Sequence, residues 1–236
     1  MTETQVCFLK HFTHLTGEVF PLCITLDVPV EGPGELMDSI TVFLNKTLYA
    51  FFDNGSDRHL PYEQVHSKNR ARLADHYRDL YFPYFEEDRS GMHEFLSDCL
   101  DVKLATQTDT YVTYGVEHIF WGEGVETDTE WITFLIGDGH RLSEVISELN
   151  LYRFYKDHPE YRNDNVCETV LDRYRKHIIF SGDEVNVGLL ADSVAIQYVY
   201  APGIFEIVKY PANAISPYLS TEAQELILNT TNRKQP

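Results

Sequence analysis

The sequence predicts an α+β protein in which helices pack on antiparallel sheets, in the order β-β-α-α-β-β-β-α-α-β-β. Three observations support this fold class: apolar residues alternate in residues 19–30, recur at helical spacing in residues 35–51, and alternate again in residues 101–136. The chain has 236 residues, of which 43% are apolar, so it can bury a sizeable core. Since no internal repeat or linker is found, we expect a compact fold.

The first predicted elements are a hairpin and two helices. Residues 6–12 and 19–30 form the strands, with a turn at residues 16–18. The first helix begins at Glu35 and ends at residues 53–56, because its apolar positions recur every three or four residues. Pro61 suits the first position of a second helix, which Pro83 is expected to end. We interpret the basic stripe of this helix as a solvated face; it comprises Lys68, Arg70, Arg72 and Arg78.

The remaining elements are a meander, a helical stretch and a final sheet. The meander strands are residues 102–106, 111–121 and 131–136. Helices are expected between residues 142 and 176, interrupted near Pro159, and strands at residues 185–190 and 204–210. The pattern thus predicts a strand–helix–meander region at 1–146, a helix-plus-sheet region at 147–222 packed on it as one compact unit, and a tail at 223–236.

The four cysteines, at positions 7, 23, 99 and 167, leave two interpretations open. Cys7 and Cys23 lie on the two strands of the predicted hairpin, so they could form a disulfide. Buried free thiols are the favoured alternative, because cysteine is among the most frequently buried residue types. No zinc-type spacing of Cys and His is present.

Charge and motifs exclude several functions. The formal charge of −18 and the pI near 4.8 argue against nucleic acid or an anionic membrane as partner. No stretch approaches 18 consecutive apolar residues, so we expect no transmembrane segment. The sequence has no H-E-x-x-H, no G-x-S-x-G elbow and no phosphate-binding glycine loop. We therefore expect no catalytic residue, no metal site and no cofactor, and we interpret the acids from Glu123 to Glu130 as a solvated loop.

Aromatic residues on the central hairpin are the candidate binding residues. Tyr114, Trp121 and Trp131 lie on or beside its two strands, and Glu123 lies in the turn between them. An edge tyrosine or tryptophan next to a carboxylate can stack on a sugar ring or anchor a partner protein. We predict a binding surface from these four residues, although most aromatic side chains of the chain must lie in its core.

The order of three segments resembles a known family. The first segment is the hairpin of residues 111–136 with Gly139-His-Arg-Leu-Ser-Glu-Val-Ile146, similar to G-x-x-L-S-x-x-[IVF]. The second is residues 184–187 with residues 194–203, similar to Y-E-I-A-x-Y-x-x-G. The third is residues 205–211 with Ile215-Ser-Pro-Tyr-Leu219, similar to x-V-x-[IL]-P-Y-x-x-[IL]-x-x-[YL]-L. Over residues 5–220 the chain thus resembles the extracytoplasmic module of RsiV-type anti-sigma factors and PdaC-type polysaccharide deacetylases, which also stands alone in envelope proteins of Bacteroides-like bacteria.

The resemblance implies a location, a function and one change in the fold. It implies an extracytoplasmic setting, periplasmic or lipid-anchored as in a lipoprotein, with a leader that is not in this chain. Because one branch of the family recognises lysozyme, it implies a binding module for a basic protein or for cell-wall glycan. The family's Gly-Gly-Ala-His reads Trp121-Gly-Glu-Gly124 here, and its Tyr-Glu reads Ser193-Val194. The family pattern also implies a helical turn or loop at residues 190–200.

Two other functions stay open beside the binding module. One is a hydrolase acting on cell-wall glycan through a pair of carboxylates, which the sequence does not identify. The other is a structural protein of the envelope without a small ligand.

Overall fold

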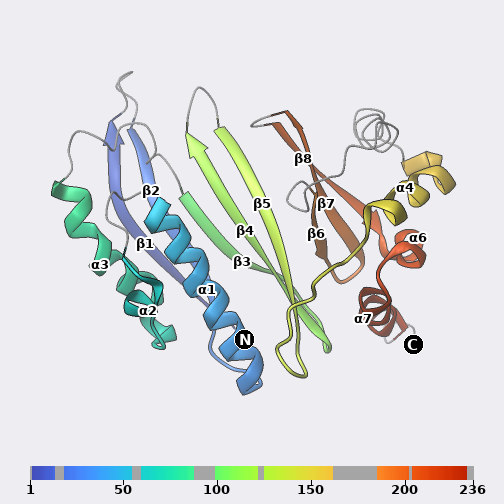
Figure 1. The fold of residues 1–236 in the computed structure, drawn as a ribbon, viewed down its shortest axis with the longest axis horizontal. Helices are drawn as coiled ribbons and strands as arrows, with labels where there is room; N and C mark the ends of the chain where they lie inside the picture. The colour runs from blue at the N-terminus through green and yellow to red at the C-terminus, as the bar shows by residue number, and fades with distance from the viewer. Residues whose placement is uncertain are drawn as a thin grey trace. The chain divides into compact units, whose positions relative to one another are not determined.

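A computed structural model describes residues 2–13, 19–54, 60–87, 99–121, 125–161, 185–201 and 204–232. It confirms the α+β class, with two sheets and helices in the described part of the chain (Figure 1). The five-stranded sheet has the order β1 (Thr2–Thr13), β2 (Val19–Pro29), β3 (Cys99–Gln107), β4 (Tyr111–Trp121) and β5 (Val125–Leu135). The three-stranded sheet consists of β6 (Val185–Leu189), β7 (Ser193–Ala201) and β8 (Ile204–Pro211).

The helical elements lie between and after these strands. The longer helices are α1 (Gly34–Asn54), α3 (Leu73–Glu87), α4 (Glu148–Asp157) and α7 (Thr221–Asn232). The short ones are α2 (Tyr62–Val65), α6 (Ala212–Ile215) and the 3₁₀ turns η1 (Arg70–Arg72), η2 (Pro159–Tyr161) and η3 (Ser216–Tyr218). The helix predicted around Val166 to Tyr174 lies outside the described residues.

The chain forms two compact units that are not continuous in sequence. Unit 1 comprises residues 1–104, 116–128 and 137–140, and unit 2 comprises residues 105–115, 129–136 and 141–236. The boundary therefore falls within strands β3, β4 and β5, whereas the regions suggested by the sequence are continuous stretches that meet at residue 146.

In unit 1, one face of strands β1 and β2 forms the core with α1 and α3. Ile24, Leu26 and Val28 of β2 are at most 1% exposed, as the alternating pattern predicts. They pack in a core with Leu44 and Leu48 of α1, both fully buried. The predicted first helix is confirmed, and its helical period explains how one stripe of α1 is buried while Val42 stays exposed.

The disulfide is different from the two alternatives that the sequence left open. Cys23 is bonded to Cys99, and Cys7 is free and buried. Cys7 lies opposite Ile24 in the antiparallel β1–β2 register, so it points to the face opposite to that of Cys23. Cys23 and Cys99 are direct partners in the parallel β2–β3 register, with Cα atoms 4.7 Å apart, and their side chains share a face. A hairpin disulfide between Cys7 and Cys23 is therefore wrong.

The predicted second helix is divided into three pieces, which are α2, the 3₁₀ turn η1 and α3. Helix α2 ends at Val65, and α3 begins only at Leu73 and continues past Pro83 to Glu87. The side chain of Asn45 explains the interruption, because its Oδ1 accepts the Ser67 N–H at 2.7 Å and its Nδ2 donates to the Ser67 carbonyl at 2.9 Å. These bonds hold Ser67 in a non-helical connection, which follows the extended backbone of His66.

Unit 2 has its own hydrophobic core under the three-stranded sheet. Val194 and Ile196 of β7 pack in it with Leu151 and Phe154 of α4. The Ser147 side chain caps α4 by accepting the Asn150 N–H. Strand β7 spans Ser193–Ala201 and pairs with both neighbours, so the helical turn or loop implied by the family pattern is wrong.

The C-terminal segment belongs to the fold of unit 2. Residues 223–236 were expected as a tail, but Thr221–Asn232 form α7. Ala223, Leu226 and Ile227 of α7 are buried in the same core as Leu219, because the apolar residues recur at helical spacing.

Candidate functional site

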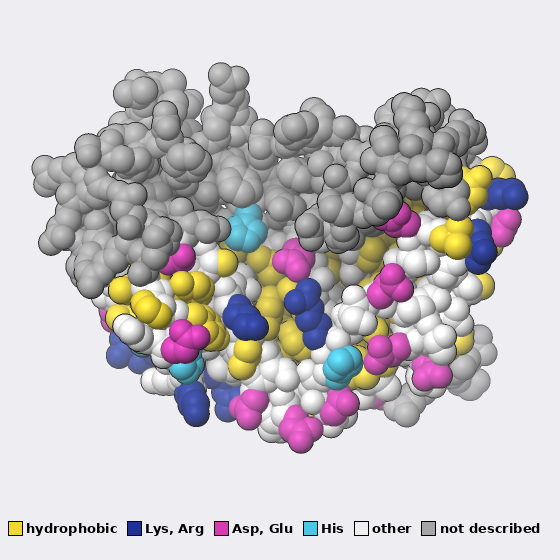
Figure 2. Space-filling model, in the orientation of Figure 1, with side chains coloured by type: hydrophobic (Ala, Val, Ile, Leu, Met, Phe, Trp, Pro, Cys, Tyr) yellow, Lys and Arg dark blue, Asp and Glu magenta, His cyan; other side chains and the backbone are white. Residues whose placement is uncertain are grey.

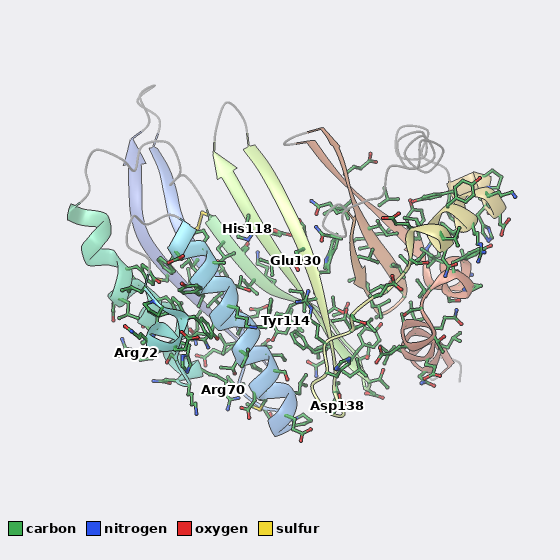
Figure 3. All side chains as sticks on the ribbon, in the orientation of Figure 1. Arg70, Arg72, Tyr114, His118, Glu130 and Asp138 are labelled. Atoms are coloured by element: carbon green, nitrogen blue, oxygen red, sulfur yellow. A yellow bond between two sulfur atoms is a disulfide. The ribbon has the colours of Figure 1, made fainter. Side chains whose placement is uncertain are left out.

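The structure describes the side chains of two of the four residues that the sequence grouped as a binding surface, Tyr114 and Trp131. Tyr114 lies on β4 and is fully buried, so its ring is not available to a ligand at the surface (Figure 3). Trp131 on β5 is half-buried. The side chain of Trp121 and the whole of Glu123 lie outside the described residues, so their role stays a prediction.

The indole of Trp131 has a packing role inside unit 2. A Cβ atom added to Gly188 on β6 would lie 2.5 Å from Cγ of Trp131, so strand and ring approach each other more closely than any side chain allows. A Cβ atom added to Gly115 on β4, the second glycine beside the ring, would lie 3.7 Å from the indole, which is an ordinary contact distance. Trp131 thus fills space beside two glycines.

A hollow of about 310 Å³ lies in unit 1, on the segment that connects α2 to α3. It is lined by Ser67, Asn69, Arg72, His76, Asp79 and Leu80. The wall is fixed on one side by the Asn45 bonds to Ser67 and on the other by α3, in which Tyr77 donates to the Asn45 carbonyl at 3.0 Å. The hollow therefore lies on a segment that is held in place by buried hydrogen bonds.

The charged groups around the hollow are unevenly matched. Arg78 holds two carboxylates: its Nη1 lies 2.8 Å from Asp75 Oδ1, and its Nη2 lies 2.7 Å from Asp79 Oδ1. Arg72 contacts the other oxygen of Asp75 only at 3.4 Å, and its side chain is 64% exposed. Arg72 is consequently less closely paired than Arg78. Figure 3 shows that Arg70 and Arg72 extend from this segment.

The polar groups in the wall have defined orientations. His76 Nε2 lies 2.7 Å from the Val65 carbonyl, and since a carbonyl only accepts, this nitrogen carries the proton. Ser67 Oγ accepts the Asn69 N–H at 3.1 Å, which leaves the hydroxyl hydrogen for another acceptor. The hollow thus offers more hydrogen-bond donors than acceptors.

A second group of interest is an aromatic cluster in unit 2. The ring of Phe154 lies 5.2–5.7 Å from the rings of Tyr155, His158, Tyr161, Tyr210 and Tyr218. His158, Tyr161 and Tyr218 are only half-buried, whereas Tyr155 and Tyr210 are buried and share a hydrogen bond of 2.8 Å between their hydroxyls. The cluster therefore presents ring surface on its outer side.

Two exposed carboxylates lie beside these outer rings. The Tyr218 hydroxyl donates to Asp157 Oδ2 at 3.0 Å, and this bond together with burial raises the pKa of Tyr218. His158 Nδ1 lies 3.1 Å from Glu160 Oε1. A hydrogen bond from its own backbone N–H and the bond with His158 lower the pKa of Glu160. A general acid needs a raised pKa, so Glu160 is unsuited to that role.

The described residues hold neither a metal-binding cluster nor a membrane-spanning helix. Within the described ranges there is no group of three or more His, Cys, Asp or Glu side chains that could hold a metal ion. Likewise, none of the helices in the described part of the chain is both long and apolar enough to cross a bilayer.

Sequence reasoning found part of the hollow but not its character. It identified the basic stripe of Lys68, Arg70, Arg72 and Arg78 as a solvated face. The missed signal is the combination of that stripe with Ser67, Asn69 and His76 in an otherwise acidic chain. The non-helical connection at residues 66–69 brings these side chains together, and it depends on Asn45, which is distant in sequence.

Comparisons with known proteins show the fold alone. The chain is similar to the solved structure of a DUF3298 family member from Bacteroides fragilis, with 14% identity, 98% of both chains covered and a TM-score of 0.55. A DUF3298 family protein from Pseudomonas aeruginosa matches with 11% identity, 94% of both chains covered and a TM-score of 0.50. No family model matches the sequence, and no curated protein matches it significantly. The described fold is thus shared with proteins of a domain family of unknown function.

Proposed function

We propose that this chain is a non-catalytic binding module of the bacterial cell envelope whose ligand is a basic protein of the lysozyme type. The observation that supports this proposal is the acidic charge of the chain, which has 19 Lys and Arg against 37 Asp and Glu. In unit 2 the described carboxylates belong to Asp109, Glu130, Glu144, Glu148, Asp157, Glu160, Asp192, Glu206, Glu222 and Glu225. The described cations of that unit are Arg141, Arg153, Lys156 and Lys209.

Two of these carboxylates lie beside a basic side chain of the unit: Arg141 lies 3.4 Å from Glu130, and His158 contacts Glu160. Acidic side chains are spread over the described part of the face in Figure 2 instead of forming one cluster. A surface of this kind attracts a basic partner over distances of about a Debye length, roughly 8 Å at physiological ionic strength, and accelerates its association.

The disulfide supports the envelope location. Cys23–Cys99 joins two adjacent strands of unit 1. Such bonds persist in oxidising compartments, including the bacterial periplasm, and are rare in the reducing cytosol. This agrees with the extracytoplasmic setting that the family resemblance implies.

The proposal is tested by calorimetric titration with lysozyme at low and at physiological salt. We expect saturable binding whose affinity falls as salt increases, because screening weakens charge attraction. Binding that does not change with salt would contradict the electrostatic basis, and no heat at either salt concentration would contradict the proposed ligand.

A pair of matched variants locates the binding surface. Glu144→Lys with Glu225→Lys changes two exposed side chains of unit 2, and Glu3→Lys with Glu63→Lys makes the same charge change in unit 1. Both double variants shift the net charge from −18 by the same amount. We expect the unit 2 variant to weaken lysozyme binding more than the unit 1 variant. Equal weakening would indicate a long-range effect of net charge without a defined surface.

Cell-wall glycan is the second candidate ligand, and the aromatic cluster favours it. The half-buried rings of Tyr161 and Tyr218 lie on the outer side of the cluster, close to the carboxylates of Asp157 and Glu160, and sugar sites often combine such rings with acceptors. Titration with soluble peptidoglycan fragments tests this candidate. Tyr218→Ala should then abolish fragment binding while lysozyme binding persists.

The same titrations separate the two remaining functions. A hydrolase would convert peptidoglycan fragments into smaller products, which chromatography detects after incubation. A structural protein of the envelope would bind neither lysozyme nor fragments.

Trp121→Ala tests the remaining part of the predicted surface, since unchanged affinity in a folded variant would remove Trp121 from it.

A further inference from the structure

We infer that the hollow of unit 1 is a binding site for a small organic acid, with Arg72 receiving the carboxylate or phosphate group and Leu80 contacting the apolar part. This site is independent of the proposed function, which places the protein ligand on unit 2. The inference rests on four features of the hollow: its charge, its donors, its size and its rigidity.

The segment that forms the hollow has a charge opposite to that of the chain, and the lining itself holds one cation, Arg72, and one carboxylate, Asp79. Residues 66–80 contain four Lys or Arg residues and two Asp residues, whereas the whole chain has 19 Lys and Arg against 37 Asp and Glu. Asp79 lines the hollow, but Arg78 contacts its Oδ1 through Nε at 2.9 Å and through Nη2 at 2.7 Å. Arg78, which it shares with Asp75, therefore offsets part of the charge of this carboxylate.

Arg72 is the side chain in the wall best able to receive an external anion. Its Nε and Nη2 both contact a single oxygen of Asp75 at 3.4 Å, a length at which a hydrogen bond is weak. Asp75 in turn is bonded more closely to Arg78, at 2.8 Å. A planar oxyanion would offer Arg72 two parallel hydrogen bonds of normal length, which is the arrangement that guanidinium groups favour.

One further donor lies in the lining of the hollow. The Ser67 hydroxyl accepts from the Asn69 N–H and so keeps its own hydrogen for a ligand. The His76 N–H is already given to the Val65 carbonyl, so this ring orients the wall and is not counted as a donor to the ligand. Leu80, one helical turn after His76 on α3, adds an apolar contact. A cation and a hydroxyl donor together with an apolar side chain fit an acid with a compact hydrophobic group.

The size and rigidity of the hollow agree with this ligand. Its volume of about 310 Å³ lies at the lower end of the range for small-molecule sites. Ser67 is fixed by two hydrogen bonds to Asn45, so the wall is formed before a ligand binds. Preorganisation of this kind reduces the entropy that binding would otherwise cost.

The experiment is an NMR titration of the full chain with four probes: inorganic phosphate, phenyl phosphate, benzoate and benzyl alcohol. We expect saturable shifts of amides in residues 66–80 with phenyl phosphate or benzoate, weaker binding of inorganic phosphate, and none of benzyl alcohol. Comparison of phenyl phosphate with benzoate decides between the phosphate and the carboxylate as the preferred group. Equal binding of benzyl alcohol, or no saturable shift with any probe, would overturn the inference.

Three variants provide directional controls. Arg72→Gln should weaken binding of the preferred acid by roughly five- to tenfold, because it removes a charge-assisted pair. Asp79→Asn should strengthen it by about two- to fivefold, since it removes an exposed negative charge from the wall. Arg153→Gln removes a comparably exposed cation from unit 2 and should leave binding unchanged.

The controls also identify the alternative explanations. Equal weakening by Arg153→Gln and Arg72→Gln would show non-specific attraction of anions and would overturn the site. Weaker binding in Asp79→Asn would show that the carboxylate itself contacts the ligand, which also contradicts an oxyanion at Arg72. Thermal unfolding of each variant measures whether the fold is retained. If Arg72→Gln does not fold, Arg72→Lys takes its place in the titration, because lysine keeps the charge but loses the planar fork.

Discussion

Both units bury tyrosine side chains, but the buried rings pack differently in the two units. In unit 1, Phe52, Tyr77 and Tyr81 are stacked, with interplanar angles of 2–16°. Tyr77 donates to Asn45, so this aromatic stack is part of a polar network. In unit 2, the rings around Phe154 meet mostly at steep angles, and Tyr155 and Tyr210 bond to each other.

The difference shows what each arrangement is suited to do. The Asn45 network of unit 1 joins the Ser67 backbone, 22 residues further along the chain, and the Tyr77 hydroxyl, 32 residues further along, and it fixes the non-helical wall of the hollow. The ring cluster of unit 2 is held by packing between the rings, and its outer rings stay half-buried. A rigid polar wall suits a small charged ligand, whereas an aromatic surface beside carboxylates suits a larger one.

The largest effect is expected in the cluster of unit 2. Phe154→Ala should lower the free energy of unfolding by about 3–5 kcal/mol, because it removes a fully buried ring from the centre of five neighbours. Urea denaturation followed by circular dichroism measures the change. A loss below about 1 kcal/mol would mean that the neighbouring side chains fill the cavity left by Phe154, so that the cluster does not depend on close packing around this ring.

The disulfide of unit 1 comes next. Replacing Cys23 and Cys99 together by serine should lower the free energy of unfolding by about 2–4 kcal/mol, since the bond closes a loop between residues 76 positions apart. The measurement is denaturation with and without reductant. Reductant should destabilise the native chain and leave the double variant unchanged. An effect of reductant on the double variant would assign the role to another cysteine.

A smaller loss is expected from the polar network of unit 1. Asn45→Ala should cost about 2–3 kcal/mol, because it leaves the Ser67 N–H without its acceptor and removes one of the two acceptors of the Tyr77 hydroxyl. Asn229→Ala is the control, since Asn229 is exposed and lies in unit 2. The amide shifts of residues 66–69 should change only in the first variant. If they stay in place, the wall does not depend on Asn45.

The smallest effects compare two neighbouring tyrosines. Tyr77→Phe should cost about 1–2 kcal/mol because it removes the hydroxyl that bonds to Asn45. The Tyr81 hydroxyl is buried and has no hydrogen-bond partner among the described residues, so Tyr81→Phe should change stability by less than about 0.5 kcal/mol or raise it. Thermal unfolding of both variants measures the difference. Equal losses would mean that ring packing, and not the polar network, decides stability in unit 1.

The sequence determined most of the elements, because their patterns are local. Alternation located strands β2, β3 and β4, and the three- and four-residue period located α1. Prediction from the sequence failed where a residue far along the chain determines the local structure. Asn45 interrupts the predicted second helix at Ser67, and residues 221–232 form a helix whose buried face depends on the core of unit 2.

The candidate site shows the same division. The sequence contained the basic stripe and the aromatic hairpin, but it could not rank them, since exposure depends on tertiary packing. Tyr114 was predicted to bind and is fully buried, whereas Arg72 was assigned to a solvated face and lines a hollow. Neither outcome can be derived from spacing along the chain.

By itself, then, the amino-acid order determined the α+β class, the acidic charge and the main strands and helices, since these follow from composition and from periodicity within a few residues. The tertiary structure decided which cysteines bond, where the second helix is interrupted and which charged side chains share a hollow. Each of those outcomes requires residues far apart in sequence to meet. Strand register brings Cys99 to Cys23, and the buried amide of Asn45 brings α1 to Ser67.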